Sequence, residues 1–295
     1  MMNPETENKL RALVRWGLYP ASWLVVLVAA SMMLSDRVDE KTAWTLSMAV
    51  LFPVFAVVEW RLPYQARWAM TFPSFVSDMK YLVVNSAFMS VVSAGLALFT
   101  ISLSGNTEGM ASTWPLPLQL IACMLIFEAI NYILHRTMHE ARGQVGKTLW
   151  RIHAVHHLPP RLYVLMHAVF HPLNSLIIQP IALIFPVWIM GYSQDTVTLF
   201  LMIMGMHGLL SHFNVDIRMG WANRVFVGPE LHRYHHSADV SEAKNYGGLL
   251  SVYDQLFGTF VYTPGTPPEH LGVDAASNMP PYDQTLEVLR LPFNR

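Results

Sequence analysis

Four stretches of this chain are long and apolar enough to cross a lipid bilayer, and they constrain the fold more than any other feature. They run over Leu18–Leu34, Thr42–Trp60, Phe75–Leu103 and Leu116–Leu134. A helical span needs about 20 residues, and inside a bilayer only helices or closed barrels satisfy the backbone. Charged residues make up 13% of the chain, well below the level of about 25% that is usual in soluble domains. We therefore predict an all-α integral membrane protein.

A second apolar block, Leu173–Leu210, leaves two topologies open. Pro180, Pro186 and the turn-like segment Gly191–Asp195 interrupt it. The block forms either two further spans or a pair of shorter helices in a re-entrant hairpin. Both alternatives return the chain to the side from which it entered.

The basic residues indicate which side that is. Lys and Arg precede the first predicted span, lie between the second and third, and follow the fourth. In the opposite loops, Arg37 and Lys41 are balanced by acidic residues, and 104–114 has no Lys or Arg. The positive-inside rule then places both termini and the region after the fourth span in the cytoplasm. Short loops and sparse targeting signals favour a bacterial inner membrane.

Histidine spacing carries the chemical signal. The chain has 13 histidines, and they recur as HRTMH, HAVHH, MHGLLSH and HRYHH. Spacings of three and four place side chains on one face of a helix, so HRTMH, HAVHH and HRYHH each predict converging imidazoles. MHGLLSH, whose histidines are five residues apart, offers two further candidate ligands. The predicted metal ligands are His135, His139, His153, His156, His157, His207, His212, His232, His235 and His236.

The number and type of these ligands narrow the choice of metal. Ten imidazoles suit two divalent ions with about five nitrogens each, and imidazole accepts zinc, copper, iron and nickel alike. The single cysteine, Cys123, excludes a thiolate zinc site and an iron–sulfur cluster held by this chain alone. Glu140 follows His139 instead of lying between two ligands, so the HExxH motif of zinc hydrolases is absent. Two open metals favour redox chemistry with iron, and a zinc-binding membrane hydrolase remains the alternative.

The motifs also resemble those of the fatty acid hydroxylase / sterol desaturase superfamily. HRTMH, HAVHH and HRYHH match its histidine boxes in order, and FHPLN, HFNVD, PELHRYHHS and NYGGLLSVYDQLFGTF extend the likeness over about 128–260. The resemblance implies a single domain over 1–295: mainly transmembrane helices in 1–134, a cytoplasmic His-rich helical cap with the catalytic region in 128–260, and a tail in 261–295. It also implies two iron ions held by the ten histidines, with His207 and His212 in the box that varies most.

Four further residues are candidates for support of the ligands. Glu140 and Asp216 can accept N–H bonds from ligand imidazoles, although an ordinary surface carboxylate explains each equally well. His171 fits a supporting or structural role better than that of a ligand. Asn245 can brace the last histidine triplet or approach a metal. Glu128, in the last turns of the fourth span, suggests either a function or a pairing with a neighbouring helix.

The activity implied by the resemblance is hydroxylation of a lipid C–H bond with dioxygen. The lipid is a fatty acyl chain, a sterol or a related molecule, and a desaturase on the same centre is the alternative. No Rossmann or haem-binding motif is present in the chain, so we expect an external electron donor of the ferredoxin or cytochrome type. The net charge of −1 gives no basic field for nucleic acid.

Overall fold

The computed structural model describes residues 3–103 and 109–294, with the side chains of 93–103 outside that description, and every named secondary-structure element in those ranges is a helix. The chain begins with an antiparallel pair, α1 (Pro4–Leu34) and α2 (Glu40–Arg61). Side-chain oxygens start both helices: Asn3 accepts the Glu5 N–H, and Asp39 accepts the Thr42 N–H at 2.7 Å. Such caps satisfy N–H groups that have no partner within the helix.

Two more long helices follow, α3 (Phe72–Leu103) and α4 (Leu116–Glu140), and then the shorter α5 (Gly143–His157). Within the described residues, four helical stretches are long and apolar enough to cross a membrane: α1, α2, α4 and Pro172–Met190. Three of them contain predicted spans. The third predicted span also forms one helix, α3, whose side chains are described as far as Val92. The expectation of an all-α protein with long apolar helices is confirmed.

The second apolar block forms a helical hairpin. Its first arm joins α6 (Pro172–Ile178), a π-helical turn (Gln179–Ile184) and α7 (Phe185–Met190), and its second arm is α8 (Gln194–Ser211). The expected turn between the arms is present, with Gly191 at φ 65°. The expected interruption at Pro180 and Pro186 is absent. Each proline lies at the start of a helical segment, and the π-helical turn changes the hydrogen-bond pattern where proline has no N–H to donate.

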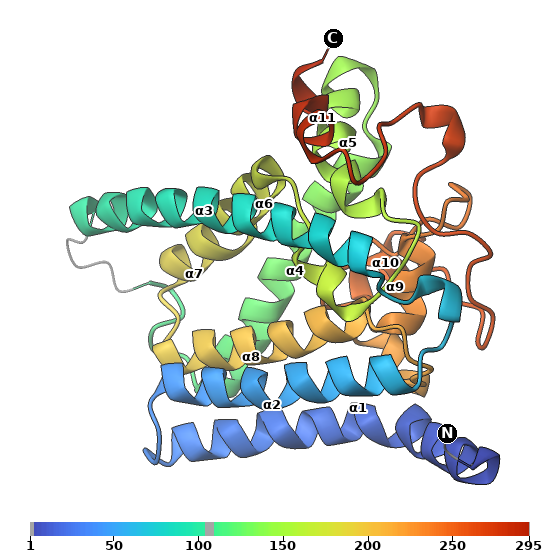
Figure 1. Cartoon of the computed structure of the whole chain (residues 1–295). Coiled ribbons are helices and arrows are strands. Elements are labelled where there is room, and N and C mark those ends of the chain that lie inside the picture. The colour runs from blue at the N-terminus through green and yellow to red at the C-terminus, as the bar shows by residue number, and fades with distance from the viewer. Residues whose placement is uncertain (1–2, 104–108, 295) are drawn as a thin grey trace.

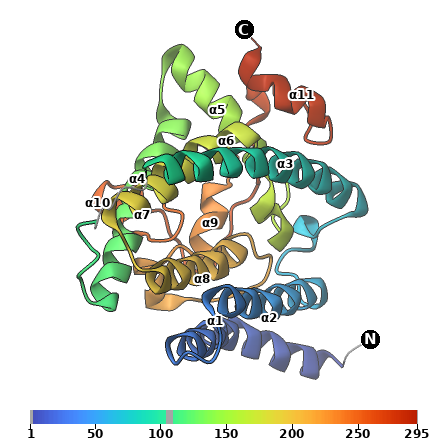
Figure 2. The ribbon, with the colours of Figure 1, turned by 90° about the vertical axis from the view of Figure 1, so that its left-hand side faces the viewer.

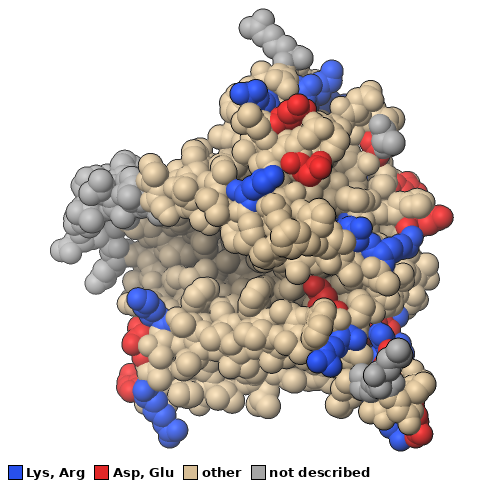
Figure 3. Space-filling model, in the orientation of Figure 1, with Lys and Arg blue, Asp and Glu red and all other residues tan. Residues whose placement is uncertain are grey.

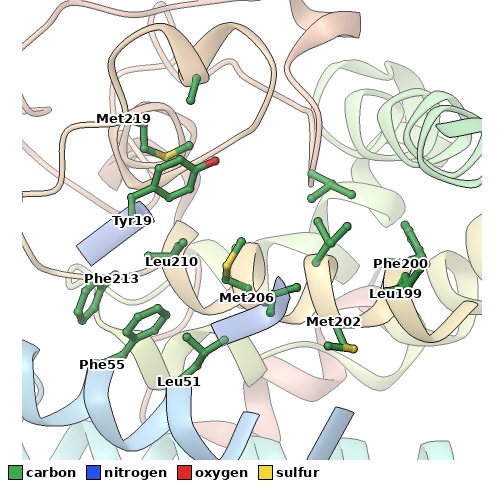
Figure 4. Close-up of a cluster of buried hydrophobic side chains, with 14 of the residues drawn as sticks. Tyr19, Leu51, Phe55, Leu199, Phe200, Met202, Met206, Leu210, Phe213 and Met219 are labelled. Atoms are coloured by element: carbon green, nitrogen blue, oxygen red, sulfur yellow. The ribbon is translucent and has the colours of Figure 1, made fainter. Parts of the chain in front are cut away.

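Helices α1, α2 and α8 form one layer, and α3 crosses above it with the α6–α7 arm (Figure 1). Helix α4 links the two layers. In the view turned by 90°, α3 lies apart from α1 and α2 (Figure 2). Buried side chains of α1, α2 and α8 fill the lower layer (Figure 4), where Phe55 stacks on Phe213 with ring centroids 4.9 Å apart.

The remaining elements cover one end of these layers. They are α9 (Pro229–His235), α10 (Val252–Leu256) and α11 (Thr285–Arg290). Helix α9 packs against α8, and its Arg233 donates to the carbonyls of Phe213 and Val215. These contacts carry the last histidine triplet to the ends of α4, α5 and α8.

Candidate metal centre

Nine buried or half-buried histidines meet in two groups between α4, α5, α8 and α9. Within each group the ligand nitrogens all lie within 4.8 Å of one another. We call the first group cluster A and the second cluster B. Cluster A contains His135, His139, His153, His157 and His235, and cluster B contains His156, His212, His232 and His236.

Each histidine triplet is divided between the two clusters. In α5, His153 and His157 enter cluster A and His156 enters cluster B. In α9 the assignment is reversed, since His232 and His236 enter cluster B and His235 enters cluster A. The sequence predicted that each triplet converges on a single face. The structure shows that the two imidazoles four residues apart stay together while the third, displaced by about 100° around the helix, reaches the neighbouring group.

The tautomers of cluster A leave lone pairs facing one another. His135 donates its Nδ1–H to the Tyr246 carbonyl at 2.7 Å, and His153 donates its Nδ1–H to Asn174 Oδ1 at 2.9 Å. Neutral rings held in this way carry no proton on Nε2. The two Nε2 atoms nevertheless lie 2.9 Å apart. Two ligand nitrogens about 2.1 Å from one ion and at right angles are about 3 Å apart, so a cation between these atoms fits the observed spacing.

Cluster B repeats this arrangement at His156. His156 donates its Nδ1–H to the Val169 carbonyl at 2.9 Å, and its Nε2 lies 3.0 Å from His212 Nε2. His232 Nε2 lies 3.0 Å from His212 Nε2 and 3.1 Å from His236 Nε2. Burial, reinforced by the neighbouring imidazoles, lowers the pKa of His232 and His236 well below the usual value. The rings are therefore neutral and available as ligands.

Two further nitrogens of cluster A have no partner at all. His139 Nε2 and His235 Nε2 are buried without a hydrogen bond to any described residue. A buried polar atom left unsatisfied costs about 1–3 kcal/mol. His235 donates its Nδ1–H to the Lys244 carbonyl, which again directs its Nε2 lone pair into the cluster. An all-imidazole donor set suits iron, zinc or copper, and the residues present fit a pair of such ions.

His207 lies in neither cluster. Its ring stacks on Phe226 with centroids 4.6 Å apart, and its Nδ1–H is donated to the Val227 carbonyl at 3.2 Å. Tyr19 and Trp23 of α1 contact it edge-on. The aromatic surroundings hold this imidazole among α1, α8 and the segment before α9.

The four supporting candidates contact other groups. Glu140 pairs with Arg136 and Lys244 and accepts the Tyr246 hydroxyl at 2.9 Å. Asp216 pairs with Arg15 and Arg218. Neither carboxylate has a described contact with an imidazole. His171 caps α6 by accepting the Leu173 N–H, and it donates to the Leu289 carbonyl. Asn245, at φ 57°, binds the backbone of Leu231 and Val261 through its side chain. It thus braces α9, which carries the last triplet.

The groups that do fix the imidazoles were missed by sequence reasoning. They are the carbonyls of Val169, Lys244 and Tyr246 and the side chain of Asn174. A backbone carbonyl leaves no residue-type signal in a sequence. Asn174 did leave one, because it ends the FHPLN motif, but the sequence alone does not say that its amide oxygen faces His153.

Asn174→Ala should weaken metal binding about 10- to 100-fold, which is the usual effect of removing a group that orients a ligand. Without the Oδ1 acceptor, the His153 ring loses its fixed tautomer. A chelator titration of the purified protein measures the change, and Asn174→Asp, which retains an acceptor oxygen, is the matched control. Equal metal retention by Asn174→Ala and the unsubstituted protein would contradict this role.

Two buried carboxylates hold the loop that supplies the Tyr246 carbonyl. Glu128 of α4 accepts the N–H groups of Gly248, Leu249 and Leu250 at 2.6–2.8 Å. Asp254 of α10 accepts those of Tyr246 and Gly247, both at 2.8 Å. The expected partner of Glu128 was a neighbouring helix; its described contacts are instead with the backbone of the loop Gly248–Leu250 and with Asn131 of its own helix.

An apolar cavity of about 250 Å³ borders both clusters. His135 and His153 of cluster A and His156, His212 and His232 of cluster B form its inner wall. Phe127, Phe170, Ile178 and Met204 contribute apolar walls from α4, α6 and α8 and the segment before α6. The face shown in Figure 3 is hollowed between α3 and the α1–α2–α8 layer, and no Lys, Arg, Asp or Glu is visible inside the hollow.

A second pocket of about 420 Å³ borders cluster A alone. Its lining includes His139, His157 and His235 together with Glu140 and Lys244. Residues 272–274 and 276–277 of the tail form its outer wall. The centre therefore lies between an apolar cavity and a polar one.

Comparison with known proteins gives a consistent picture. Residues 120–259 match the family model described as fatty acid hydroxylase. An ornithine lipid hydroxylase, OlsE, of Rhizobium tropici is 28% identical over 91% of this chain and 82% of its own length. A methylsterol monooxygenase of Arabidopsis thaliana is 26% identical over 72% of this chain and 77% of its own, and an alkylglycerol monooxygenase of Caenorhabditis elegans is 28% identical over 50% and 28%. No solved structure matches.

Proposed function

Because this chain belongs to the fatty acid hydroxylase family of membrane oxidoreductases, we propose that it hydroxylates a C–H bond of a membrane lipid at a pair of iron ions. In the balanced reaction one atom of dioxygen enters the new C–O bond and the other leaves as water. Two electrons and two protons are consumed. The electrons come from a separate ferredoxin- or cytochrome-type protein.

One observation carries this proposal: both imidazole clusters border the same apolar cavity. Nine histidines would hold the two irons, five in cluster A and four in cluster B. When bound, the ions supply the activation of dioxygen. The side chains of the cavity orient an acyl or ring segment, and their apolar character excludes water from the reacting carbon.

The substrate we propose is a lipid with an amino-acid headgroup. The similarity to an ornithine lipid hydroxylase extends over most of both chains, whereas that to the alkylglycerol monooxygenase covers half of this one. The uncharged walls of the cavity suit the hydrocarbon part of such a lipid, and its charged headgroup would remain outside. A desaturase would use the same cavity and the same irons, and its product would carry a double bond instead of a hydroxyl.

The proposed location is a bacterial inner membrane, with both termini and the metal centre on the cytoplasmic side. Four long apolar helices support a multi-pass protein. The basic residues in the N-terminal half of α1 and those that follow α4 support the orientation.

Removal of the metal tests the function. Protein purified in detergent from iron-supplied cells should contain about two irons per chain, in line with two clusters. With ornithine lipid, a reduced donor and ¹⁸O-labelled dioxygen, the product should gain one labelled oxygen. Chelation should abolish turnover, and iron should restore it. Two zinc ions that persist under iron supplementation, without oxygen uptake, would overturn the oxidative assignment and favour a hydrolase; an unlabelled alkene would favour a desaturase.

A further inference from the structure

We propose that His167 is the fifth imidazole ligand of cluster B. This inference rests on the proposed function, since it concerns a ligand of the same metal pair. With His167, cluster B would have five imidazole ligands, as cluster A has. His167 lies on the short helix Val164–Ala168, before α6.

The two clusters differ in one respect. Cluster A has five imidazoles and cluster B has four, although α5 and α9 contribute to them in a reversed, matching way. In cluster A, α4 contributes two histidines four residues apart, His135 and His139. In cluster B, α8 contributes His212 alone, and the position four residues before it is Gly208. Cluster B therefore lacks a ligand nitrogen at Gly208, one turn before His212 on α8.

The ring of His167 occupies the space beside Gly208. A Cβ atom built on Gly208 would lie 2.4 Å from His167 Cε1 and 2.6 Å from its Nε2. Residues four apart lie on the same face of a helix, so the His167 ring occupies the place of a side chain neighbouring His212. The two ring centroids are 5.5 Å apart, within the range of 4.3–6.3 Å found for ring pairs inside cluster B.

His167 also lacks another partner. Neither of its ring nitrogens forms a hydrogen bond to a described residue, and the side chain borders the apolar cavity together with His156, His212 and His232. An imidazole in an apolar wall is unfavourable without a partner. Its nitrogens are not within 4.8 Å of all four members of cluster B, so ligation requires the ring to turn about its side-chain bonds toward His212. Because Gly208 has no side chain, this turn of α8 does not obstruct the rotation of the His167 ring.

His207 is the competing candidate, and its surroundings argue against it. Its ring is stacked on Phe226 and its Nδ1–H is bound to the Val227 carbonyl. The described ring contacts of His207 are with Tyr19, Trp23 and Phe226 and include no member of cluster B, whereas those of His167 include His212. The two histidines therefore form a matched pair for experiment.

The test compares His167→Gln with His207→Gln in the full-length protein loaded with cobalt(II). Cobalt per chain is followed during a chelator titration, together with visible absorption, which reports coordination number without any turnover. His167→Gln should lose one of two cobalt ions at a chelator concentration at least about 100-fold lower, and its spectrum should change. Loss of a ligand should weaken binding no less than loss of a group that only orients one, which costs about 10- to 100-fold. His207→Gln and the exposed His270→Gln should match the unsubstituted protein.

A transplanted ligand separates loss of a nitrogen from loss of the fold. In the double variant His167→Ala with Gly208→His, the new imidazole stands one turn before His212 and the space around it is vacated. It should recover the second cobalt. If His167→Gln retains both ions with an unchanged spectrum, or if His207→Gln alone loses one, the assignment is overturned. Because cobalt binding is measured without substrate, a protein that binds two ions normally and oxidises no lipid would refute the proposed function alone.

Discussion

His156→Ala is expected to abolish lipid oxidation, with a loss of turnover of about 1,000-fold or more, equivalent to about 4 kcal/mol in the barrier. His156 provides one of the four nitrogens of cluster B, and its Nε2 faces His212 Nε2 at 3.0 Å. Its ring is also fixed by stacking on Phe170, with centroids 4.3 Å apart. Turnover of the purified variant and its metal content, measured on the same sample, test the expectation.

The control for this variant is His270→Ala, because His270 is exposed and lies in neither cluster. His156→Ala should still insert into the membrane and should retain more metal at cluster A than at cluster B. Full turnover by His156→Ala would remove His156 from the metal centre and with it the assignment of cluster B.

Glu128→Ala is expected to reduce the free energy of unfolding by about 3 kcal/mol or more. Glu128 is fully buried and accepts three backbone N–H groups from the loop Gly248–Leu250. Each N–H left unsatisfied in the interior costs about 1–3 kcal/mol. The same loop presents the Tyr246 carbonyl to His135, so cluster A should also bind its ion more weakly. Unfolding in detergent and metal retention are the two measurements.

Glu140→Ala is the matched control, because Glu140 is an exposed carboxylate at the end of the same helix. Its ion pairs with Arg136 and Lys244 are half-exposed, and such pairs contribute about 1 kcal/mol or less. Glu128→Gln should fall between the two, since its amide retains one acceptor oxygen. Equal stability of Glu128→Ala and Glu140→Ala would show that the loop is held by other contacts.

Much of the fold follows from the sequence because its signals are local. Apolar length predicted long helices, and spacings of three and four predicted converging imidazoles. Nine of the ten expected ligands meet in two groups. His207 lies elsewhere because it is five residues before His212, which places the two side chains on different faces of α8. Here the face that carries His207 meets Trp23 and Phe226.

The remaining features depend on contacts between distant segments. Prolines usually end helices, and Pro180 fails to do so because a π-helical turn rearranges the hydrogen bonds around it. Asp216 and Glu140 looked equally suited to supporting imidazoles or to the surface. Asp216 pairs with Arg15 and Arg218, and Glu140 pairs with Arg136 and Lys244. The acceptors that fix the ligand tautomers are mostly backbone carbonyls, and every residue type has one, so the sequence does not identify them.

The exchange of histidines between the two triplets has a thermodynamic consequence. Helices α5 and α9 each contribute to both clusters, so the first ion to bind orders two helices that the second ion also requires. The conformational entropy of α5 and α9 is lost when the first ion binds and is not lost again when the second ion binds. The second ion should therefore bind more tightly than the first. Such coupling is reciprocal. Preparations with limiting metal should therefore contain chains with two ions and chains with none, and few with one.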